Sequence, residues 1–535
     1  MVEMKKSAFM VILATMSVGA AWAQIEIDTI EELQKIGNDP GYPLHGDYVL
    51  TQDLDASPTA DWNDGAGFDP IGICSNAGEG EGEGEAISSA PFTGTFNGQG
   101  HAVTDLTIHR PDEDCVGLFA LIGLDAEVRN LDLADASIIG DSYVGGLAGK
   151  NEYGAVENCS ATGKISGHDE YTGGLAGYSD GDLVNCSSTA AVSGVDYVGG
   201  LVGCSAGGTA TGSHATGAIS GDQYVGGLVG SNDGTLEQCY ATGAVSGGWM
   251  VGGLVAENMR IVRDCYATGA VSAYVWYVGG LVGHNARGTV MSSYATGAVS
   301  ESHYYEYFGG LVGDAYEGTV TGCFWDIDSS GQNSSSGGTG LPSAAMMQAS
   351  SFTNAGWDFS DTDGDPPVWE IVEGQSFPFF YGQFEASERF ALDITFENGS
   401  VGESPDVAQH VPCSLVWLTA QPSQGFAFAG WTGAGLGTEF ALDVNPLPLV
   451  MNEYRDITAV FLRDNAIAIE DIEDLQRIGE NPEWPLDWHY VLTQDIDASA
   501  TTNWNGGAGF DPIGGYGHHF SGTFDGQGYV ITDLL

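Results

Sequence analysis

A short glycine-rich phrase that returns at nearly regular intervals constrains the fold of this chain more than any other feature. It reads YVGGLAG at residues 143–149, and close variants follow as far as residue 313. The first glycines of the Gly-Gly pairs are Gly145, Gly173, Gly199, Gly226, Gly252, Gly279 and Gly309, so the steps between them are 28, 26, 27, 26, 27 and 30 residues. Self-similarity at such a period is typical of solenoids, whose units bury their apolar faces only by stacking.

The period favours a parallel β-helix over other repeat folds. Each unit carries a second phrase, such as CYATGAVSG at residues 239–247, and turn residues divide the unit into about three short strands. Strands one coil apart are expected to pair in parallel at about 4.8 Å, with the rest of the coil as the crossover. A propeller blade needs about 40–45 residues, which is longer than these units. We therefore predict an all-β fold, a right-handed β-helix with coils of about 27 residues.

The leucine that follows every Gly-Gly pair is predicted to point into the rod and to stack on its equivalents in neighbouring coils. These leucines are Leu147, Leu175, Leu201, Leu228, Leu254, Leu281 and Leu311. Before the repeats, residues 30–37 predict a short helix that ends at Gly37. Such a helix would cover the end of the rod, where strand edges are otherwise unpaired.

The charge of the chain excludes one large class of partner. Lys and Arg total 14 against 72 Asp and Glu, which gives a formal net charge of −58. Nucleic-acid binding needs basic surface against phosphate, so this class of ligand is excluded.

The first residues have the pattern of a targeting signal. Lys5 and Lys6 precede an apolar run, and residues 21–23 fit a small-x-small cleavage site. We therefore predict a signal peptide cut near Ala23, a mature chain that is secreted or on the cell surface, and no membrane insertion of that chain.

The remaining segments suggest a tandem organisation. We expect a signal peptide at 1–23, a cap helix and opening strands at 24–110, β-helix repeats at 111–328, an exit segment at 329–389, a small β module at 390–463 and a second opening segment at 464–535. The last segment repeats the first, since residues 510–514 copy residues 68–72 at an offset of 442 and residues 520–524 copy residues 92–96 at an offset of 428. The copy stops at Leu535, where coils should begin. This pattern predicts the truncated start of a second β-helix.

The repeats resemble the GLUG motif of large bacterial surface and secreted proteins, which also occurs in non-catalytic parts of some immunoglobulin A peptidases. The resemblance rests on YVGGLVG and CYATGAVSG and extends over about residues 25–380. It implies a β-helix on or outside the cell and supplies no activity. Residues 390–462, with GFAFAGW at 425–431, resemble the divergent internalin-B-type repeat, a spacer and interaction module of bacterial surface proteins.

Cysteine recurs at one position of the repeat. The members at this position are Cys159, Cys186, Cys239, Cys265 and Cys323, and Ser213 and Ser293 stand in the missing places. An interior ladder of thiols is the favoured interpretation, because small apolar cysteine suits a crowded coil. Disulfides between adjacent coils remain an alternative, although the chain has an odd total of nine cysteines. A metal site is the least favoured, since CxxC and Cys/His spacings are missing from the sequence.

Aromatic residues form two further groups. Two positions before each Gly-Gly pair stand Tyr143, Tyr171, Tyr197, Tyr224, Met250, Tyr277 and Tyr307, which are expected to stack between coils. Adjoining turns add five more aromatics, the candidate ligand contacts Trp249, Tyr274, Trp276, Tyr304 and Tyr305. Stacked turns would bring these rings into one exposed patch, and such patches mark interaction sites. Sugar rings or a partner protein would fit this patch.

Signals for catalysis and for cofactors are weak. The sequence contains neither HExxH nor GxSxG, and its few basic residues share no position in the repeat. We therefore assign no catalytic residue and no cofactor. Calcium is a weak candidate at Asp361, Asp363 and Asp365, because the acidic spacing fits a calcium loop but the glutamate expected at its twelfth position is missing.

The sequence thus predicts a non-enzymatic, secreted or cell-surface protein of structural or adhesin-like character. Its expected partner is a glycan or a surface protein of a host or neighbouring cell. The alternative is a carbohydrate-active β-helix enzyme, either a polysaccharide lyase or a glycosidase. A groove with two facing carboxylates would favour the enzyme, and a smooth rod would favour the adhesin-like protein.

Overall fold

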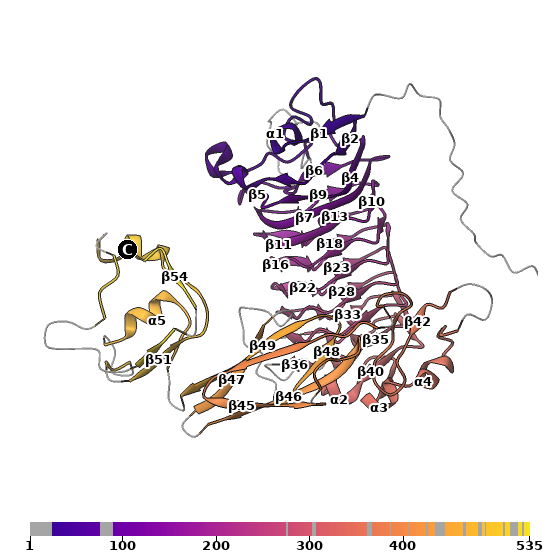
Figure 1. Cartoon of the computed structure of the whole chain (residues 1–535), viewed down its shortest axis with the longest axis vertical. Coiled ribbons are helices and arrows are strands. Elements are labelled where there is room, and N and C mark those ends of the chain that lie inside the picture. The colour runs from indigo at the N-terminus through magenta and orange to yellow at the C-terminus, as the bar shows by residue number, and fades with distance from the viewer. Residues whose placement is uncertain are drawn as a thin grey trace, which may run out of the picture.

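The computed structural model places most of the chain. It describes residues 24–74, 89–273, 276–301, 307–360, 366–385, 387–405, 407–423, 426–433, 445–463, 467–479, 484–486, 488–506, 509–513, 523–526 and 529–534. The predicted signal peptide at 1–23 lies outside the described residues. Figure 1 shows the β-helix as a vertical rod, with the small β module lying against its lower end.

The rod is a parallel β-solenoid, as predicted, with coils of about 27 residues. Two of its faces are narrow sheets with one strand from each coil. One face holds β8 (Val144–Gly145), β12 (Glu170–Gly173), β17 (Asp196–Gly199), β22 (Gln223–Gly226), β27 (Val251–Gly252), β32 (Val278–Gly279) and β37 (Phe308–Gly309). The next holds β6 (Phe119–Ile122), β9 (Ala148–Asn151), β13 (Ala176–Ser179), β18 (Val202–Ser205), β23 (Val229–Asn232), β28 (Val255–Asn258), β33 (Val282–Asn285) and β38 (Val312–Asp314).

The third face is one sheet of 26 strands, in which most coils contribute three short segments. The first column holds β7 (Glu127–Gly140), β10 (Ala155–Glu157), β14 (Leu183–Val184), β19 (Thr209–Thr211), β24 (Thr235–Glu237), β29 (Ile261–Arg263), β34 (Thr289–Met291) and β39 (Thr319–Thr321). The second holds β11 (Ser160–Gly167), β15 (Ser187–Ser188), β20 (His214–Ala215), β25 (Tyr240–Ala241), β30 (Tyr266–Ala267), β35 (Tyr294–Ala295), β40 (Phe324–Asp326) and β41 (Thr339–Leu341). The third adds β5 (Thr107–His109), β16 (Ala191–Ser193), β21 (Ile219–Ser220), β26 (Val245–Gly247), β31 (Val271–Ala273) and β36 (Val299–Glu301). A typical coil therefore has more strands than the three expected, because short turns of two or three residues interrupt the third face.

Close backbone approach, both within a coil and between coils, explains the Gly-Gly pairs. A Cβ on Gly173 would lie 2.0 Å from the carbonyl oxygen of Ala176, and one on Gly174 would lie 2.2 Å from that of Gly200. Both distances are far below van der Waals contact, so a side chain at either position would push the backbone apart. Glycine thus lets the chain turn tightly between two faces of the rod.

The interior of the rod is filled by the predicted leucines. Leu147 is 1% exposed, and the other six are fully buried. Their backbones also pair in series, since the amide of Leu201 donates to the carbonyl of Leu228 at 2.9 Å and Leu228 donates to Leu254 at 2.8 Å. The prediction that these residues point inward and stack is confirmed.

A buried amide ladder, which the sequence analysis did not anticipate, lies at one corner of the rod. The side chain of Asn232 donates to Asn258 at 2.8 Å, and Asn258 donates to Asn285 at 2.8 Å. All three are 0% exposed. Each amide can both donate and accept, so stacked copies satisfy one another inside the coil.

The N-terminal cap precedes the coils. It contains β1 (Ile25–Ile27), α1 (Ile30–Leu33), β2 (Asp47–Leu50), β3 (Leu54–Asp55), the 3₁₀ segment η1 (Ser57–Gly65) and β4 (Thr95–Thr104). The helix begins after Thr29, whose hydroxyl accepts from the amide of Glu32 at 3.3 Å, and it is shorter than the predicted 30–37. Strands β1, β2 and β4 pair in parallel, and β4 pairs with β7, so the cap leads directly into the coils.

Three further units follow the coils. The exit segment holds α2 (Ile327–Ser330), α3 (Ser343–Met346), α4 (Ala349–Thr353), β42 (Trp369–Glu370) and β43 (Phe379–Phe380). The small β module has two three-stranded sheets built from β44 (Leu392–Phe396), β45 (Gly399–Ser404), β46 (Ser414–Pro422), β47 (Phe426–Gly433), β48 (Leu447–Met451) and β49 (Arg455–Arg463). The C-terminal unit holds β50 (Ile467–Ile469), α5 (Ile472–Arg477), β51 (His489–Leu492), β52 (Ile496–Asp497), the 3₁₀ segment η2 (Ser499–Gly506), β53 (Thr523–Asp525) and β54 (Ile531–Thr532).

Candidate functional site

A column of stacked tyrosines runs along the outside of the rod. The ring centroids of Tyr143 and Tyr171 are 4.9 Å apart, those of Tyr171 and Tyr197 are 4.9 Å apart, and those of Tyr197 and Tyr224 are 4.4 Å apart. The predicted stacking is confirmed for these coils. Met250 interrupts the column, which resumes farther along the rod. Because the ring faces cover one another, this column presents ring edges and hydroxyl groups to solvent.

The backbone places these tyrosines at a tight turn. Tyr143, Tyr171 and Tyr197 have positive φ values of 57°, 64° and 56°. Side chains with a Cβ rarely adopt this left-handed region. Stacking with the next coil offsets that cost, and Lys150 adds a cation–π contact with its Nζ 3.6 Å from the Tyr143 ring centroid.

Two of the five candidate ligand contacts are described, and both lie on the surface. Trp249 is 47% exposed and Trp276 is 37% exposed. Each stands one residue before the tyrosine-column position of its coil, and the Trp276 ring is 6.2 Å from that of Tyr307. Tyr274, Tyr304 and Tyr305 lie outside the described residues, as do the calcium candidates Asp361, Asp363 and Asp365.

Carboxylates from successive coils lie near the tyrosine column. Burial raises the pKa of Asp141, and the charges of Asp114 and Asp169 raise it further. Burial also raises the pKa of Asp196, as do the nearby charges of Asp169 and Asp222. This column of like charges disfavours anionic ligands on this side of the rod.

Acidification is expected to stabilise the protein, with Asp264 as one contributor. Burial raises the pKa of Asp264 to about 6, above the value of about 4 of an unfolded aspartate. A raised folded-state pKa gives stability that is present at low pH and is lost as the pH rises through that pKa. The melting temperature should therefore be higher at pH 5 than at pH 7, and Asp264→Asn should reduce the difference. Thermal melts followed by circular dichroism measure both effects. The exposed Asp233→Asn is the matched control, and an equal pH response in both variants would contradict the assignment.

A histidine bridges two carboxylates on the second narrow face. His284 Nδ1 lies 3.5 Å from Glu257, and its Nε2 lies 3.4 Å from Asp314. The three residues occupy equivalent strand positions in consecutive coils. The Tyr277 ring stacks on His284 at 5.0 Å. The imidazole therefore fills the space between the two carboxylates.

The cysteine column lies inside the rod. Cys159, Cys186, Cys239, Cys265 and Cys323 are free and buried, which confirms the predicted interior ladder. The substituting serines fit the same column, since the Ser213 hydroxyl accepts from the amide of Cys186 at 3.0 Å and Ser293 from that of Cys265 at 3.0 Å. Within the described residues, no group of three or more His, Cys, Asp or Glu side chains could hold a metal ion.

The structure adds one disulfide outside this column. It joins Cys74 to Cys115, 41 residues apart in sequence. Cys115 is 1% exposed and is the first residue of CVGLFA at 115–120, a weak copy of the glycine-rich phrase. The sequence analysis left this pair unassigned, because an odd cysteine count and one cysteine per coil argued against a disulfide framework.

The repeat-position thiols should resist alkylation in the native protein. Burial raises the pKa of Cys186 and of Cys323 to about 12, and only the thiolate reacts readily. Without reductant, mass spectrometry should find all free cysteines alkylated after unfolding and the repeat-position ones unmodified before it. Cys74 and Cys115 serve as the internal control, since they should react only after reduction. An intact Cys239–Cys265 linkage would instead show that the ladder is oxidised.

Family comparisons assign the repeats and the module. Residues 140–166, 221–246, 247–272 and 274–300 match the GLUG motif. Residues 392–465 match the divergent InlB B-repeat domain. The chain therefore carries GLUG repeats followed by an InlB B-repeat. Both resemblances seen in the sequence are confirmed.

Two curated relatives match parts of this chain. This chain is 35% identical to halomucin of Haloquadratum walsbyi over 162 residues. The aligned part is 30% of this chain and 2% of halomucin. It is 34% identical over 137 residues to a protein of Evansella cellulosilytica that is provisionally named a Gly-rich membrane protein. The aligned part is 25% of this chain and 14% of that relative. The chain thus corresponds to a small part of each relative. The GLUG repeats and these relatives indicate a surface-associated repeat protein.

A solved structure from Bacteroides ovatus, provisionally described as an immunoglobulin A1 protease, aligns with 67% of this chain and 92% of its own. The TM-score is 0.35 and the sequence identity is 18%. A superposition of that score is too loose to support an argument about fold or activity. None of the helices in the described residues has the length and apolar composition that a membrane span requires.

A second aromatic column in the GLUG coils escaped the sequence analysis. The rings of His214 and Tyr240 are 4.6 Å apart, those of Tyr240 and Tyr266 are 4.9 Å apart, and those of Tyr266 and Tyr294 are 5.2 Å apart. A signal was present in the residue that follows each repeat-position cysteine. It is serine at Ser160 and Ser187 and becomes aromatic only in later coils.

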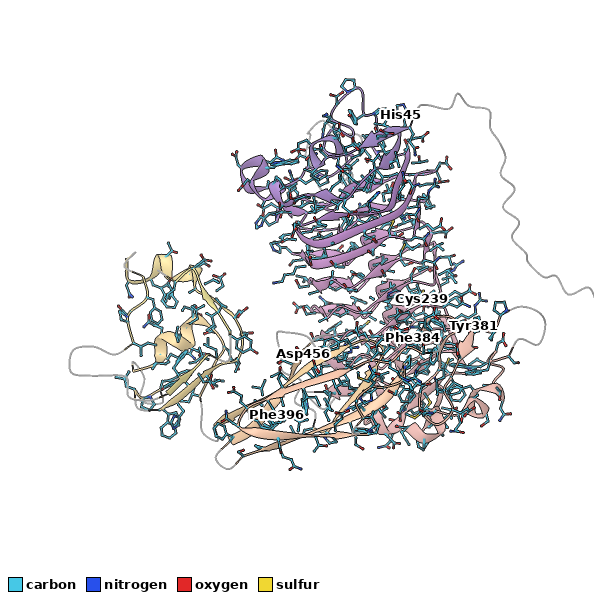
Figure 2. All side chains as sticks on the ribbon, viewed as in Figure 1. His45, Cys239, Tyr381, Phe384, Phe396 and Asp456 are labelled. Atoms are coloured by element: carbon cyan, nitrogen blue, oxygen red, sulfur yellow. A yellow bond between two sulfur atoms is a disulfide. The ribbon has the colours of Figure 1, made fainter. Side chains whose placement is uncertain are left out.

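This second column is the docking surface of the exit segment and the InlB module. The hydroxyl of Tyr294 donates to the carbonyl of Pro378, and Gln383 donates to the hydroxyl of Tyr266 at 2.7 Å. Phe384, labelled in Figure 2, packs between Phe379 and Phe390 and so joins the exit segment to the module. The later aromatic residues therefore serve packing within the chain.

A small pocket remains where the coil turns meet the module. It is lined by Thr242, Thr268 and residues 447–450 of β48, with Arg455 in its wall. Arg455 is 2% exposed and pairs with Glu453 at 3.1 Å. Its lining comes from both the coil turns and the module, so this pocket fits a packing role where the two units dock.

Proposed function

We propose that this chain is a non-enzymatic part of a secreted or cell-surface protein and acts as a stiff acidic rod with a lateral contact surface. The filled interior is the observation that carries the proposal. Leucines 0–1% exposed stack through consecutive coils, and each face pairs strand to strand along the rod. Coils of this kind supply length and outer surface, and in the described coils the stacked leucines occupy the centre of the rod.

The disulfide and the likeness to two relatives support a place outside the cell, and the charge suits a rod that stays apart from its copies. The Cys74–Cys115 disulfide is of a kind that persists in oxidising compartments. The net charge of −58 keeps such rods apart in solution and repels anionic ligands. The likeness to halomucin and to a Gly-rich membrane protein supports the same location.

The exposed tryptophans are the best contact surface of the rod. Trp249 and Trp276 lie one coil apart, and their rings are not covered by the InlB module. Aromatic rings suit the apolar faces of neutral sugars or the apolar side chains of a partner protein. The acidic column of the preceding coils reaches Asp222, whose carbonyl accepts from the amide of Trp249 at 3.0 Å, so this side of the rod disfavours sulfated or uronic acid glycans.

Removing both tryptophans is expected to weaken binding at least tenfold while leaving the fold intact. The test compares glycan-array and cell-binding signals of wild type with those of a Trp249→Ala, Trp276→Ala variant. The matched control is Tyr153→Ala, which removes a ring that is 64% exposed in a different turn. Equal binding by the double variant and the control would contradict this contact surface. A wild type that binds neither glycans nor cells would contradict an adhesin-like role.

The geometry also bears on the enzymatic alternative. Glu257 and Asp314 flank one common position on the second narrow face, but His284 lies between them. An inverting glycosidase needs that space for the sugar and a water, with carboxylates about 6.5–9.5 Å apart. A reducing-sugar assay on neutral polysaccharides, run with wild type and Glu257→Gln, tests the alternative. Sugar release that Glu257→Gln abolishes would overturn the non-enzymatic proposal.

A further inference from the structure

The C-terminal unit reproduces the cap that starts the first rod. Ile467 pairs with Tyr490 as Ile25 pairs with Tyr48, and β53 pairs with β51 as β4 pairs with β2. Both units consist of a short helix, parallel strands and a 3₁₀ segment in the same order. The two can therefore be compared residue by residue.

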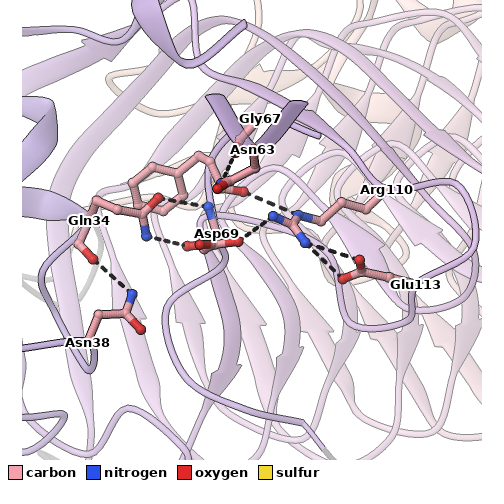
Figure 3. Close-up of polar contacts among 8 residues, drawn as sticks. Gln34, Asn38, Asn63, Gly67, Asp69, Arg110 and Glu113 are labelled. Carbon is pink, nitrogen blue, oxygen red and sulfur yellow. Dashed lines mark hydrogen bonds and ion pairs between the residues drawn. The ribbon is translucent and has the colours of Figure 1, made fainter. Parts of the chain in front are cut away.

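A pair of hydrogen bonds inside the cap, between a glutamine side chain and the backbone of an aspartate, is also repeated. In the first copy, the side-chain amide of Gln34 donates to the carbonyl of Asp69 at 3.0 Å and accepts from its amide at 2.8 Å (Figure 3). In the second copy, Gln476 makes the same two bonds with Asp511, at 3.1 and 2.9 Å. The C-terminal unit is thus folded as a cap down to its hydrogen bonds.

The two copies differ in what covers their apolar face. Phe96 and Leu106 of the first copy are fully buried, whereas their equivalents Phe524 and Leu534 are 38% and 49% exposed. Val103 is also fully buried, whereas its equivalent Ile531 is only partly buried. The apolar residues were kept in the second copy, although nothing in the described part of the chain covers them.

The first copy shows what belongs on this face. There the Phe119 ring packs against Phe96 with centroids 5.8 Å apart, and Val103 pairs with Leu133 of β7. The same coil supplies Arg110, whose guanidinium pairs with Asp69 and with Glu113 at 3.1 Å (Figure 3). One polypeptide coil therefore adds strands, apolar cover and a positive charge to the cap.

We propose that the open face of the C-terminal unit is a docking surface for a β-solenoid coil with the inward pattern of residues 107–140. The coil adds parallel strands beside β53 and β54 and covers Phe524 and Leu534 with apolar side chains. In the described residues, β53 and β54 are the last strands of their sheets, which is the position where an added strand joins a sheet. The Asp511 carboxylate, 442 residues after Asp69, would receive a basic residue of that coil, as Asp69 receives Arg110.

The test extends the full chain in register. A second copy of residues 108–389 is appended after Leu535, which aligns with Thr107 at the offset of 428. Hydrogen exchange of the amides in β53 and β54 should slow at least tenfold relative to the unextended chain. The peptides are distinguishable by mass, because TFDGQGYVIT of this unit differs from TFNGQGHAVT of the first cap. The matched control carries Phe119→Asp and Leu133→Asp in the appended copy only, and it should not slow the exchange.

Three results would overturn the proposal. Exchange in β53 and β54 could be the same with and without the extension. The appended coils could stay unfolded by protease digestion while the identical coils at 108–389 resist it, which would show that this cap does not accept a coil. Concentration-dependent dimers of the unextended chain could protect the same amides, which would make a second copy of the C-terminal unit the occupant.

Discussion

Replacing Leu228 with aspartate is expected to lower the free energy of unfolding of the rod by about 5 kcal/mol. Leu228 is fully buried between Leu201 and Leu254 of the neighbouring coils. The substitution removes apolar contacts and places a carboxyl group where no charged partner can reach it. Because each coil contacts only its neighbours, the damage should separate the rod into two weakly coupled halves.

Thermal melts and limited proteolysis would measure this effect. Thr189→Asp, an exposed position of the same rod, is the matched control and should change the melting temperature little. Proteolysis of the Leu228→Asp variant should begin near the substituted coil and spare the N-terminal cap. A melting temperature equal to that of the control would contradict the inward placement of this leucine.

Removing the Cys74–Cys115 disulfide is expected to cost the N-terminal cap about 4 kcal/mol. The estimate follows from the entropy of closing a loop of 41 residues in the unfolded chain. The loss should appear as faster hydrogen exchange in β1, β2 and β6, with little change in the later coils. Cys74→Ala combined with Cys115→Ala tests it.

The control for this prediction is Cys204→Ala, which removes a free and half-buried thiol of the same rod. It should leave exchange in the cap unchanged. A reducing agent should reproduce the double variant in wild type and have no effect on the double variant itself. Unchanged exchange in the cap of the double variant would show that the bond does not stabilise it.

The regular part of the molecule was predictable from sequence because each coil repeats the same physical problem. The Gly-Gly pair, the leucine after it and the cysteine column recur at one period, and a parallel solenoid places equivalent residues on top of one another. The inward leucines, the thiol ladder and the stacking of Tyr143 through Tyr224 follow from that single fact.

The irregular part was not predictable in the same way. Tyr240, Tyr266 and Tyr294 look like members of another ladder, but their role is set by Pro378 and Gln383, which lie about a hundred residues away in sequence. Docking between distant segments leaves no period in a sequence. The histidine bridge between Glu257 and Asp314 was missed for a different reason. Its members do share one repeat position, but earlier coils carry leucine, lysine, tyrosine, cysteine and serine there, so the position shows no constant residue type.

The docked module changes how the rod would carry a pulling force. The exit segment folds back along the coils and holds them through Tyr266 and Tyr294, with the module bonded behind it by Phe377 and Cys413. The contact between the exit segment and the second aromatic column is called the aromatic seam below. Tension applied between the N-terminal cap and the module would load this aromatic seam in shear, across several stacked rings at once. A seam loaded in shear resists through all its contacts together, whereas coils pulled from one end peel one at a time. The later coils are therefore shielded, and mechanical failure should begin in the early coils that carry Ser160 and Ser187 in place of aromatic rings.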